Sequence, residues 1–429
     1  MADQQGEAVS AVPSFGEAIR VWARIGCLSF GGPAGQIALM HREIVEVRRW
    51  LSEPQYLSAL NFCMLLPGPE AMQLATYAGW KLHGVKGGLA AGLLFVLPGA
   101  LVVLALSMLY GAFGNLPWIA AAFYGVKAAV LAIVIEALLR VARRALKSNV
   151  DWLIAALAFL ALFCFDLPFP LIVAVAALVG YLRGSEEAAA AATTRPTFAA
   201  LSSTIAIWAA IWLAPLALLA LLLGPDHVLT QIGVFFSKLA VVTFGGAYAV
   251  LSYMAQAAVE DKAWLKAPEM IDGLALAETT PGPLILVTQF VGYLAALRQM
   301  GGVWGGIAGA IVTLWMTFAP CFLWIFAGAP YIEHISKLPR LSGALAAITA
   351  GVVGVILNLS LWFGLHVIFG KVERITGVFK PWWPDWATLD WGAAGLTLIA
   401  AFVLLRLHFG IVKTLTLCAG LGLVWRLAV

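Results

Sequence analysis

Charged side chains are scarce in this sequence. Asp, Glu, Lys and Arg make up 11% of the 429 residues, whereas 62% are hydrophobic; soluble proteins carry about 25% charged residues. Stretches such as 87–124, 155–182 and 303–331 are almost free of charge. Each is at least as long as the ~20 residues with which a helix spans a bilayer. The composition excludes an ordinary soluble protein and predicts an all-α polytopic membrane protein.

Motifs for cofactors and metals are also missing. The five cysteines form no Cys-x-x-Cys pair, and the six histidines show no ligand spacing. The sequence contains no nucleotide-binding glycine loop and no metalloprotease motif. Its net charge of +4 is modest. We therefore expect no metal, no cofactor, no nucleic-acid partner and no enzymatic activity.

The hydrophobic pattern predicts about thirteen transmembrane segments in two homologous halves. The expected organisation is a polar tail without a signal sequence at 1–14, a first transporter repeat at 15–183, a linker at 184–199, a connecting transmembrane helix at 200–223 and a second repeat at 229–429. A single transmembrane helix between two six-segment halves would give the second half the opposite orientation in the membrane. The halves are therefore expected to form an inverted repeat with broken helices. The basic cluster at 140–147 places that loop in the cytoplasm, and the loops at 41–54 and 370–385 fit this orientation poorly.

The duplication is visible as three motifs that recur at one offset of 214 residues. The matched pairs are Ser-Phe-Gly-Gly at 29–32 with Thr-Phe-Gly-Gly at 243–246, Trp-Leu at 50–51 with Trp-Leu at 264–265, and Pro-Gly-Pro at 67–69 with Pro-Gly-Pro at 281–283. Transporters place substrate sites where the broken helices of two repeats meet near the middle of the bilayer. The repeated motifs are therefore the first place to look for a substrate site.

Each Pro-Gly-Pro lies within an apolar segment and is expected to break its helix. Proline lacks an N–H group and clashes with the preceding turn, and glycine adds conformational freedom. Where the helix restarts, its first N–H groups are free and carry the positive end of the helix dipole, which favours an anion. The residues predicted to bind substrate on this basis are Pro67, Gly68, Pro69, Pro281, Gly282 and Pro283. A purely structural kink is the alternative. Gly31, Gly32, Gly245 and Gly246 also interrupt an apolar segment, and they either contact substrate or allow close helix packing.

Three basic residues are candidates for balancing the charge of an anion. Arg24 and Lys238 are also 214 positions apart, and each lies five residues before its Phe-Gly-Gly-containing motif. The alternative for both is a side chain that snorkels from a helix end. Lys127 lies in the middle of a predicted helix, where a charge is costly unless it is hydrated or paired. It is either functional or a pore-lining or partnered structural residue.

Two acidic residues next to the breaks are candidates for proton coupling. Glu70 follows the first Pro-Gly-Pro directly, and Glu278 precedes the second by three residues. Acids inside a membrane often mark proton relays. For Glu70 the alternative is a helix cap favoured by the dipole. Neutral side chains near the breaks that could donate hydrogen bonds are Asn61, Gln73, Thr279 and Thr280.

The ordered motifs resemble the chromate ion transporter family. They are Phe-Gly-Gly-Pro at 30–33, Arg-Arg-Trp-Leu-Ser at 48–52 and Leu-Pro-Gly-Pro at 66–69, repeated more loosely in the second half. The resemblance implies a bacterial inner-membrane protein of two homologous halves that exports chromate and confers chromate resistance. It also implies that sulfate, the isosteric oxyanion, competes or is itself transported. Ala247 stands where the first half has Pro33, so the halves are expected to differ in role.

Other functions fit part of the pattern. A passive anion channel also uses broken helices, and a transporter of another small anion would share this architecture. An intramembrane enzyme would need a nucleophile with a base, or a set of metal ligands, and the sequence offers neither. The expected partners are the transported chromate or sulfate and the lipid bilayer, and a homodimer is compatible with the sequence.

Overall fold

The computed structural model describes residues 12–30, 32–114, 116–184, 198–244, 247–332, 339–377 and 379–428. Three predicted substrate-binding glycines, Gly31, Gly245 and Gly246, lie outside the described residues, as do most of the 184–199 linker and most of the 1–14 tail.

The first half consists of helices that end where the sequence breaks them. They are α1 (Phe15–Leu28), α2 (Gly32–His41), the π-helical turn η1 (Arg42–Val47), α3 (Glu53–Leu65), α4 (Glu70–Phe113), α5 (Pro117–Ala145), α6 (Asn149–Phe165) and α7 (Phe169–Arg183). Local side chains fix several of the starts. At α3, for example, the Ser52 hydroxyl accepts from the Gln55 N–H and the Gln55 side chain accepts from the Ser52 N–H, which is a capping box.

Helix α4 is a helical hairpin rather than one straight rod. Its backbone leaves helical geometry at His83 (φ −136°) and Gly84 (φ 63°). The two limbs pack so closely that a Cβ added to Gly79 would lie 2.3 Å from the carbonyl oxygen of Gly87. The two limbs therefore lie directly against each other.

The second half repeats the order of the first after the connecting helix α8 (Phe198–Leu223). Its elements are α9 (Val228–Val242), α10 (Ala247–Gln256), η2 (Ala257–Asp261), α11 (Ala267–Thr279), η3 (Leu284–Leu286), α12 (Val287–Met300), α13 (Gly302–Gly328), η4 (Ala329–Tyr331), α15 (Pro339–Ile368), a hairpin of β1 (Val372–Arg374) and β2 (Trp382–Pro384), η5 (Trp386–Thr388), α16 (Trp391–Leu405) and α17 (Ile411–Ala428). Strands β1 and β2 are antiparallel, with Glu373 opposite Trp383.

The repeat extends to the backbone conformation. The π-helical turns η1 and η2 occur at matched positions. Each is followed by a residue with positive φ, Arg49 at 52° and Ala263 at 49°, and these two residues are 214 positions apart. Since neither residue is a glycine, the shared unusual conformation indicates a common local fold.

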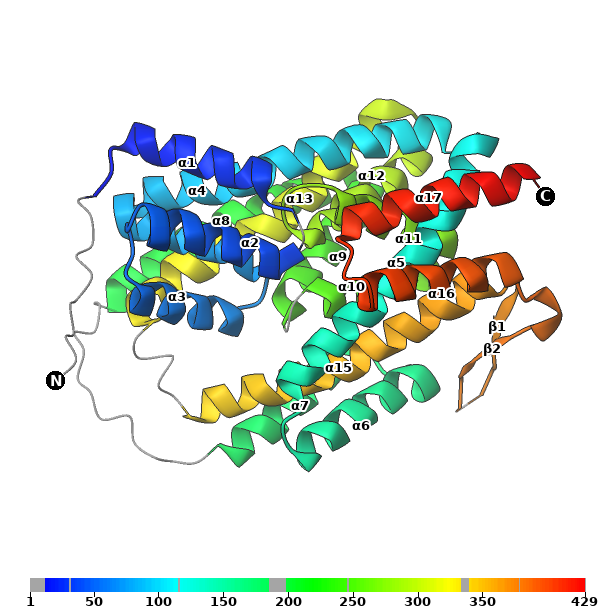
Figure 1. Ribbon diagram of the computed structural model, residues 1–429. Coiled ribbons are helices and arrows are strands. Elements are labelled where there is room, and N and C mark those ends of the chain that lie inside the picture. The colour runs from blue at the N-terminus through cyan, green and yellow to red at the C-terminus, as the bar shows by residue number, and fades with distance from the viewer. Residues whose placement is uncertain are drawn as a thin grey trace.

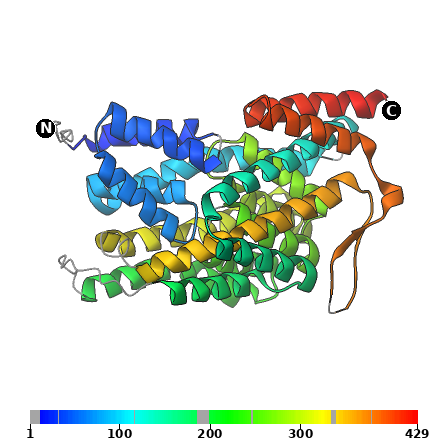
Figure 2. The same ribbon diagram turned by 60° about the horizontal axis from the view of Figure 1, so that its bottom comes forward.

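Helices of each half pack on the other half. Helix α5 packs on α16 and α17, α15 packs on α6 and α7, and α5 and α15 contact each other. Small residues make these contacts close: Gly125 of α5 meets Gly422 of α17, and Gly343 of α15 meets Gly180 of α7. In Figures 1 and 2, α1–α3 lie at one end of the molecule and α16, α17 and the β hairpin at the other. The halves are thus interlocked.

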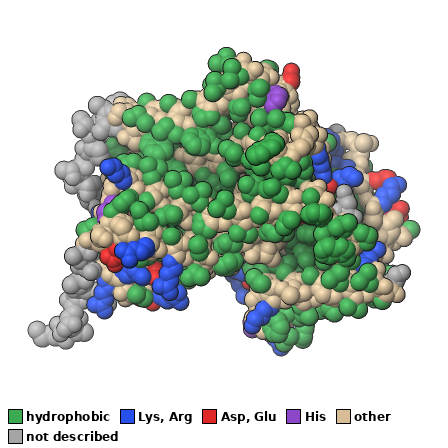
Figure 3. Space-filling view, turned by 90° about the horizontal axis from the view of Figure 1, so that it is seen from above, with side chains coloured by type: hydrophobic (Ala, Val, Ile, Leu, Met, Phe, Trp, Pro, Cys, Tyr) green, Lys and Arg blue, Asp and Glu red, His purple; other side chains and the backbone are tan. Residues whose placement is uncertain are grey.

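The helices have the composition of membrane spans. Among the described residues, six helices are long and apolar enough to cross a membrane, namely α4, α5, α8, α13, α15 and α17, and shorter apolar helices accompany them. In Figure 3, charged side chains gather toward two ends of the visible face, and hydrophobic side chains fill the band between. The prediction of an all-α membrane protein agrees with this fold, apart from the small hairpin. The count of thirteen spans and the inverted relation of the halves stay predictions.

Candidate functional site

Both Pro-Gly-Pro motifs break the chain between two helices, as predicted. At the first break (residues 66–69), Leu66 is extended, Gly68 has φ 119° and Pro69 caps α4. At the second break (residues 280–283), Thr280 is extended, Gly282 has φ 91° and Pro283 caps η3. Positive φ at both central positions explains why each motif carries a glycine.

The two breaks are held by a reciprocal exchange of hydrogen bonds between the halves. The Gly68 N–H donates to the Thr243 carbonyl oxygen at 2.8 Å, which we call the first crossing, and the Gly282 N–H donates to the Ser29 carbonyl oxygen at 2.9 Å, the second crossing. Gly68 and Gly282 are 214 positions apart, and so are Ser29 and Thr243. Each Pro-Gly-Pro therefore bonds to the Phe-Gly-Gly-containing motif of the other half.

Each crossing lies within a few residues along the chain of the points where two helical segments begin. The first crossing lies between the start of α4 at Glu70 and the chain entering α10 at Ala247. The second lies between the start of η3 and the chain entering α2 at Gly32. The first N–H groups of a helix have no intrahelical acceptor, and the dipole places positive charge there. The arrangement can therefore bind an anion.

Two glutamines hold carbonyl oxygens at the breaks. Gln36 Nε2 donates to the Gly282 carbonyl oxygen at 2.6 Å, and Gln73 Nε2 donates to the Pro67 carbonyl oxygen at 2.7 Å. Both side-chain oxygens are buried without a hydrogen-bond partner among the described residues. Gln73 was named from the sequence, but Gln36 was missed. A polar side chain in an otherwise apolar helix, four residues after Gly32, was the available signal.

The matched basic residues lie beside the breaks rather than inside them. Arg24 on α1 and Lys238 on α9 are both exposed, one turn before their helices end. Within the described part of the chain, neither side chain has an ion-pair partner. Both side chains therefore lie on the surface of the described structure.

Lys127 has an acidic partner on another helix. Its Nζ lies 3.4 Å from Oδ1 of Asp272 on α11, and the Tyr110 hydroxyl donates to Oδ2 of the same carboxylate at 2.8 Å. The Asp272 side chain is 5% exposed. Lys127 thus corresponds to the partnered alternative. Sequence reasoning missed Asp272, although an acid within the apolar helix before the second Pro-Gly-Pro was a visible signal.

The two predicted proton-coupling acids have different surroundings. Glu70 is the first residue of α4 and is partly buried at the first break. Glu278 is buried one turn before the second break, and its Oε1 accepts from the Tyr248 hydroxyl of α10 at 2.5 Å. Arg140 of α5 is close enough to Glu278 to interact with it electrostatically. Glu278 thus connects the second break to the helix that begins at the first crossing.

Comparison with known proteins assigns the family. The sequence pattern of the family described as Chromate transporter matches residues 16–181 and 230–423. This chain belongs to the chromate transporter family. It is a multi-pass protein of the bacterial inner-membrane type, and the two matched regions of the chain correspond to its two halves.

Three relatives are similar to this chain over most of their length. This chain is 34% identical over 359 residues to the chromate transport protein of Pseudomonas aeruginosa, covering 82% of each chain. It is 32% identical over 358 residues to the chromate transport protein of Cupriavidus metallidurans, covering 79% of this chain and 80% of the relative. It is 31% identical over 341 residues to the probable chromate transport protein of Synechococcus elongatus, covering 80% and 82%. No solved structure matches the chain.

Proposed function

We propose that this protein is a secondary transporter that exports chromate across the cytoplasmic membrane and thereby confers chromate resistance. The names of its relatives support chromate as the substrate. The observation that carries the proposal is the pair of crossings, in which each Pro-Gly-Pro break is hydrogen-bonded to the other half close to points where helices begin. A purely structural kink would not require each break to bond to the other half.

Chromate suits such a site because it is a dianion with four oxygens and no hydrogen-bond donor. Backbone N–H groups at the starts of α2, α4, α10 and η3 can donate to its oxygens, and the helix dipoles favour its charge. Arg24 and Lys238 supply positive charge on the approach from either half. Sulfate has the same shape and charge, so we expect it to compete.

The reciprocal geometry also provides for alternating access. If the halves form an inverted repeat, the first and second crossings exchange roles when the protein opens to the opposite side. The substrate then stays at the breaks while α5 and α15, each packed on the other half, move as part of two rocking bodies. Close packing at Gly125 and Gly343 keeps these bodies rigid.

Export is energetically reasonable for a dianion. Moving two negative charges out of a cell with a negative interior is favoured by about 4.6 kcal/mol per 100 mV of membrane potential. We propose Glu70 and Glu278 as the groups that exchange protons during the cycle, since each lies at a break and Glu278 contacts α10 through Tyr248. Proton exchange would link the crossings to a pH gradient.

The test is chromate uptake into inside-out membrane vesicles, in which an exporter fills the lumen. We expect saturable uptake that depends on an imposed pH gradient or membrane potential and is suppressed by excess sulfate. Non-saturating uptake would favour the passive channel, and uptake no greater than in control vesicles would refute chromate as the substrate.

The matched basic residues are tested in the same assay. Replacing both Arg24 and Lys238 with alanine should lower uptake strongly at an unchanged protein level in the membrane. Arg20→Ala is the control, because Arg20 lies one turn earlier on α1 and its Nε donates to the Gly16 carbonyl oxygen. Full uptake by the double variant would refute the charge-balancing role.

A further inference from the structure

A polar cluster lies beside the second break and is built from three helices. The Tyr248 hydroxyl of α10 donates to Oε1 of Glu278 on α11 at 2.5 Å. On α5, Nη2 of Arg140 donates to Oε1 of Glu136, which lies one turn earlier on the same helix. The Arg140 guanidinium also interacts electrostatically with Glu278 and Tyr248. The four side chains therefore belong to one electrostatic unit.

The two acids of this cluster differ in their access to water. Glu278 is 5% exposed, whereas the side chain of Glu136 is 26% exposed and that of Arg140 is 38% exposed. Helix α5 ends soon after Arg140, at Ala145, in the basic segment that the sequence predicts to be cytoplasmic. The cluster thus extends from a buried acid at the second break to a partly exposed acid on α5.

The charges within the cluster do not balance when both acids are ionised. The carboxyl groups of Glu136 and Glu278 share one guanidinium, that of Arg140. The Tyr248 hydroxyl carries no charge at neutral pH. Two carboxylates near one another disfavour the ionisation of both, and an unbalanced charge inside a membrane protein is costly. One bound proton would make the cluster neutral.

Neighbouring charged groups do not supply a second cation. Lys127 and Asp272 also lie on α5 and α11, but they pair with each other at 3.4 Å. Arg143 and Arg144, in the last turn of α5, are exposed, where water screens their charge. The deficit of one positive charge therefore stays with the cluster.

The hydrogen bonds indicate which acid holds the proton in this structure. Glu136 receives the charged donor, the Arg140 guanidinium, and a charged donor forms its strongest bond with a carboxylate. Glu278 receives a neutral donor, the Tyr248 hydroxyl. The arrangement fits an ionised Glu136 and a protonated Glu278.

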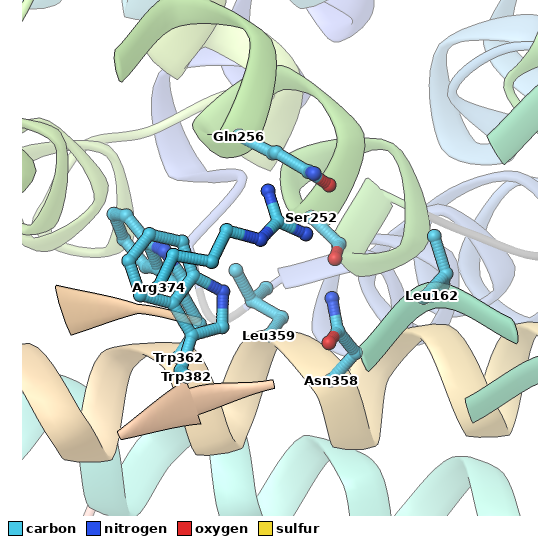
Figure 4. Close-up of a pocket in the computed structure, with 8 residues that line it drawn as sticks. All are labelled: Leu162, Ser252, Gln256, Asn358, Leu359, Trp362, Arg374 and Trp382. Carbon is cyan, nitrogen blue, oxygen red and sulfur yellow. The ribbon is translucent and has the colours of Figure 1, made fainter. Parts of the chain in front are cut away.

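Helix α10 is anchored at its other end, which keeps Tyr248 beside Glu278. Figure 4 shows Gln256, the last residue of α10, close to Arg374 of the β hairpin. Gln256 Nε2 donates to Asp166 Oδ1 at 2.6 Å, and Arg374 Nη2 lies 2.8 Å from the same oxygen. Since α10 also begins at the first crossing, Tyr248 connects that crossing with the acid at the second break.

The first half has no such cluster at the matched positions. The offset of 214 residues places Met64 opposite Glu278 and Ala34 opposite Tyr248. Neither side chain can bind a proton or donate a strong hydrogen bond. A proton held in this way therefore belongs to the second half only.

We propose that Glu136 and Glu278 share one proton and that Glu136 is a further proton-coupling residue. The proton moves from the Glu278 carboxyl group to the Glu136 carboxylate. The Arg140 guanidinium stays protonated and turns from Glu136 to the newly formed carboxylate of Glu278. The cluster keeps its net charge, so no unpaired charge is left buried. Glu136, which is partly exposed, then exchanges the proton with water.

The sharing of the proton is independent of transport, whereas its role in coupling rests on the proposed function. The first experiment therefore examines the purified full-length protein at neutral pH without chromate. It measures the infrared carbonyl band of protonated carboxyl groups in the unaltered protein, in Glu136→Gln and in Glu278→Gln. When either acid is removed, the other pairs with Arg140 and ionises. Each variant should therefore lose the band intensity of one carboxyl group.

An unchanged band in Glu136→Gln would show that Glu278 holds its proton alone, and this would overturn the proposal. An unchanged band in Glu278→Gln would overturn it as well. Arg140→Gln removes the cation that stabilises one carboxylate, so its band should grow. A smaller band in Arg140→Gln would also contradict a shared proton.

The matched control is Glu269→Gln. Glu269 is also on α11, but its two oxygens accept from Arg298 at 2.6 Å and 3.0 Å. One carboxylate with one guanidinium leaves no charge for a proton to balance, so this variant should keep the full band. A loss equal to that in Glu136→Gln would mean that the band reports a general change in the protein, and the proposal would fail.

The second experiment measures chromate uptake into inside-out vesicles at a fixed membrane potential, with and without an imposed pH gradient. Uptake by Glu136→Gln should be the same in both conditions, whereas Glu269→Gln should respond to the gradient as the unaltered protein does. A full response in Glu136→Gln would overturn its role in coupling, even if the infrared band is lost. Chromate uptake by the unaltered protein no greater than in control vesicles, with the infrared result as expected, would instead refute the proposed function.

Discussion

Replacing Gly68 with alanine tests whether the first crossing carries transport. Gly68 has φ 119°, a region that costs a side chain about 1–3 kcal/mol. An added Cβ would lie 2.8 Å from Gln73 Nε2 and 3.0 Å from Cys321 Sγ, so the Gln73 amide must move away from the Pro67 carbonyl oxygen. Losing that hydrogen bond costs about 1 kcal/mol more.

The total of about 2–4 kcal/mol is smaller than the 5–15 kcal/mol by which native proteins are typically stable. We therefore expect Gly68→Ala to fold and to reach the membrane, with the first crossing displaced. If about 1.4 kcal/mol of this cost falls on the transport step, uptake slows tenfold. We predict at least a tenfold slower saturable chromate uptake into inside-out vesicles at equal protein level.

Gly84→Ala is the matched control, because Gly84 also has positive φ (63°) but no atom within 4 Å of an added Cβ. It carries similar backbone strain in the turn of α4 without touching either break. Wild-type uptake by Gly68→Ala would refute the role of the first crossing. An equal loss in both variants would mean that strain in α4, rather than the crossing, limits transport.

Three further perturbations test other parts of the site. Gly99→Ala should slow chromate uptake, because the added Cβ would lie 2.1 Å from the Pro281 carbonyl oxygen at the second break. Gly111→Ala should not slow uptake, because the nearest atom to its added Cβ is a side-chain methyl group at 2.8 Å. Equal uptake by the two variants would contradict this reasoning. Lys127→Ala removes the cationic partner of the buried Asp272 carboxylate and should destabilise the protein by about 3–5 kcal/mol. We expect a lower Tm in detergent, which the additional substitution Asp272→Asn should partly restore. An unchanged Tm would show that the ion pair is not structural. Glu278→Gln keeps the shape of the side chain but removes its charge. Chromate uptake should therefore no longer respond to an imposed pH gradient, although sulfate should still inhibit it. If uptake still responds to the gradient, Glu278 is not a proton-coupling residue.

Several features of the site could be predicted because they depend on local chain chemistry. Two prolines that flank a glycine strongly disfavour a continuous helix, because each proline lacks an N–H group and clashes with its own preceding turn, whereas the single prolines Pro98 and Pro320 remain inside α4 and α13. The structure accordingly breaks at Gly68 and Gly282. Matched positions in the two halves, such as Arg24 and Lys238, follow from the duplication alone.

Partners that come from distant segments could not be predicted in the same way. No spacing rule connects Lys127 with Asp272, its partner 145 positions away. Arg374 likewise joins Asp166 and Glu260 only because the β hairpin folds back on the helices. The packing of all the helices together determines which distant residues come into contact as such pairs.

The duplication, the membrane composition, the resemblance to the chromate transporter family and the positions of the Pro-Gly-Pro breaks could all be inferred from the sequence alone. Composition, proline chemistry and a constant offset of 214 residues are properties of the chain that do not depend on its fold. The hydrogen bonds from each break to the other half, from Gly68 to Thr243 and from Gly282 to Ser29, are visible only in the folded structure. A free N–H needs an acceptor, but which carbonyl accepts depends on how the two halves pack.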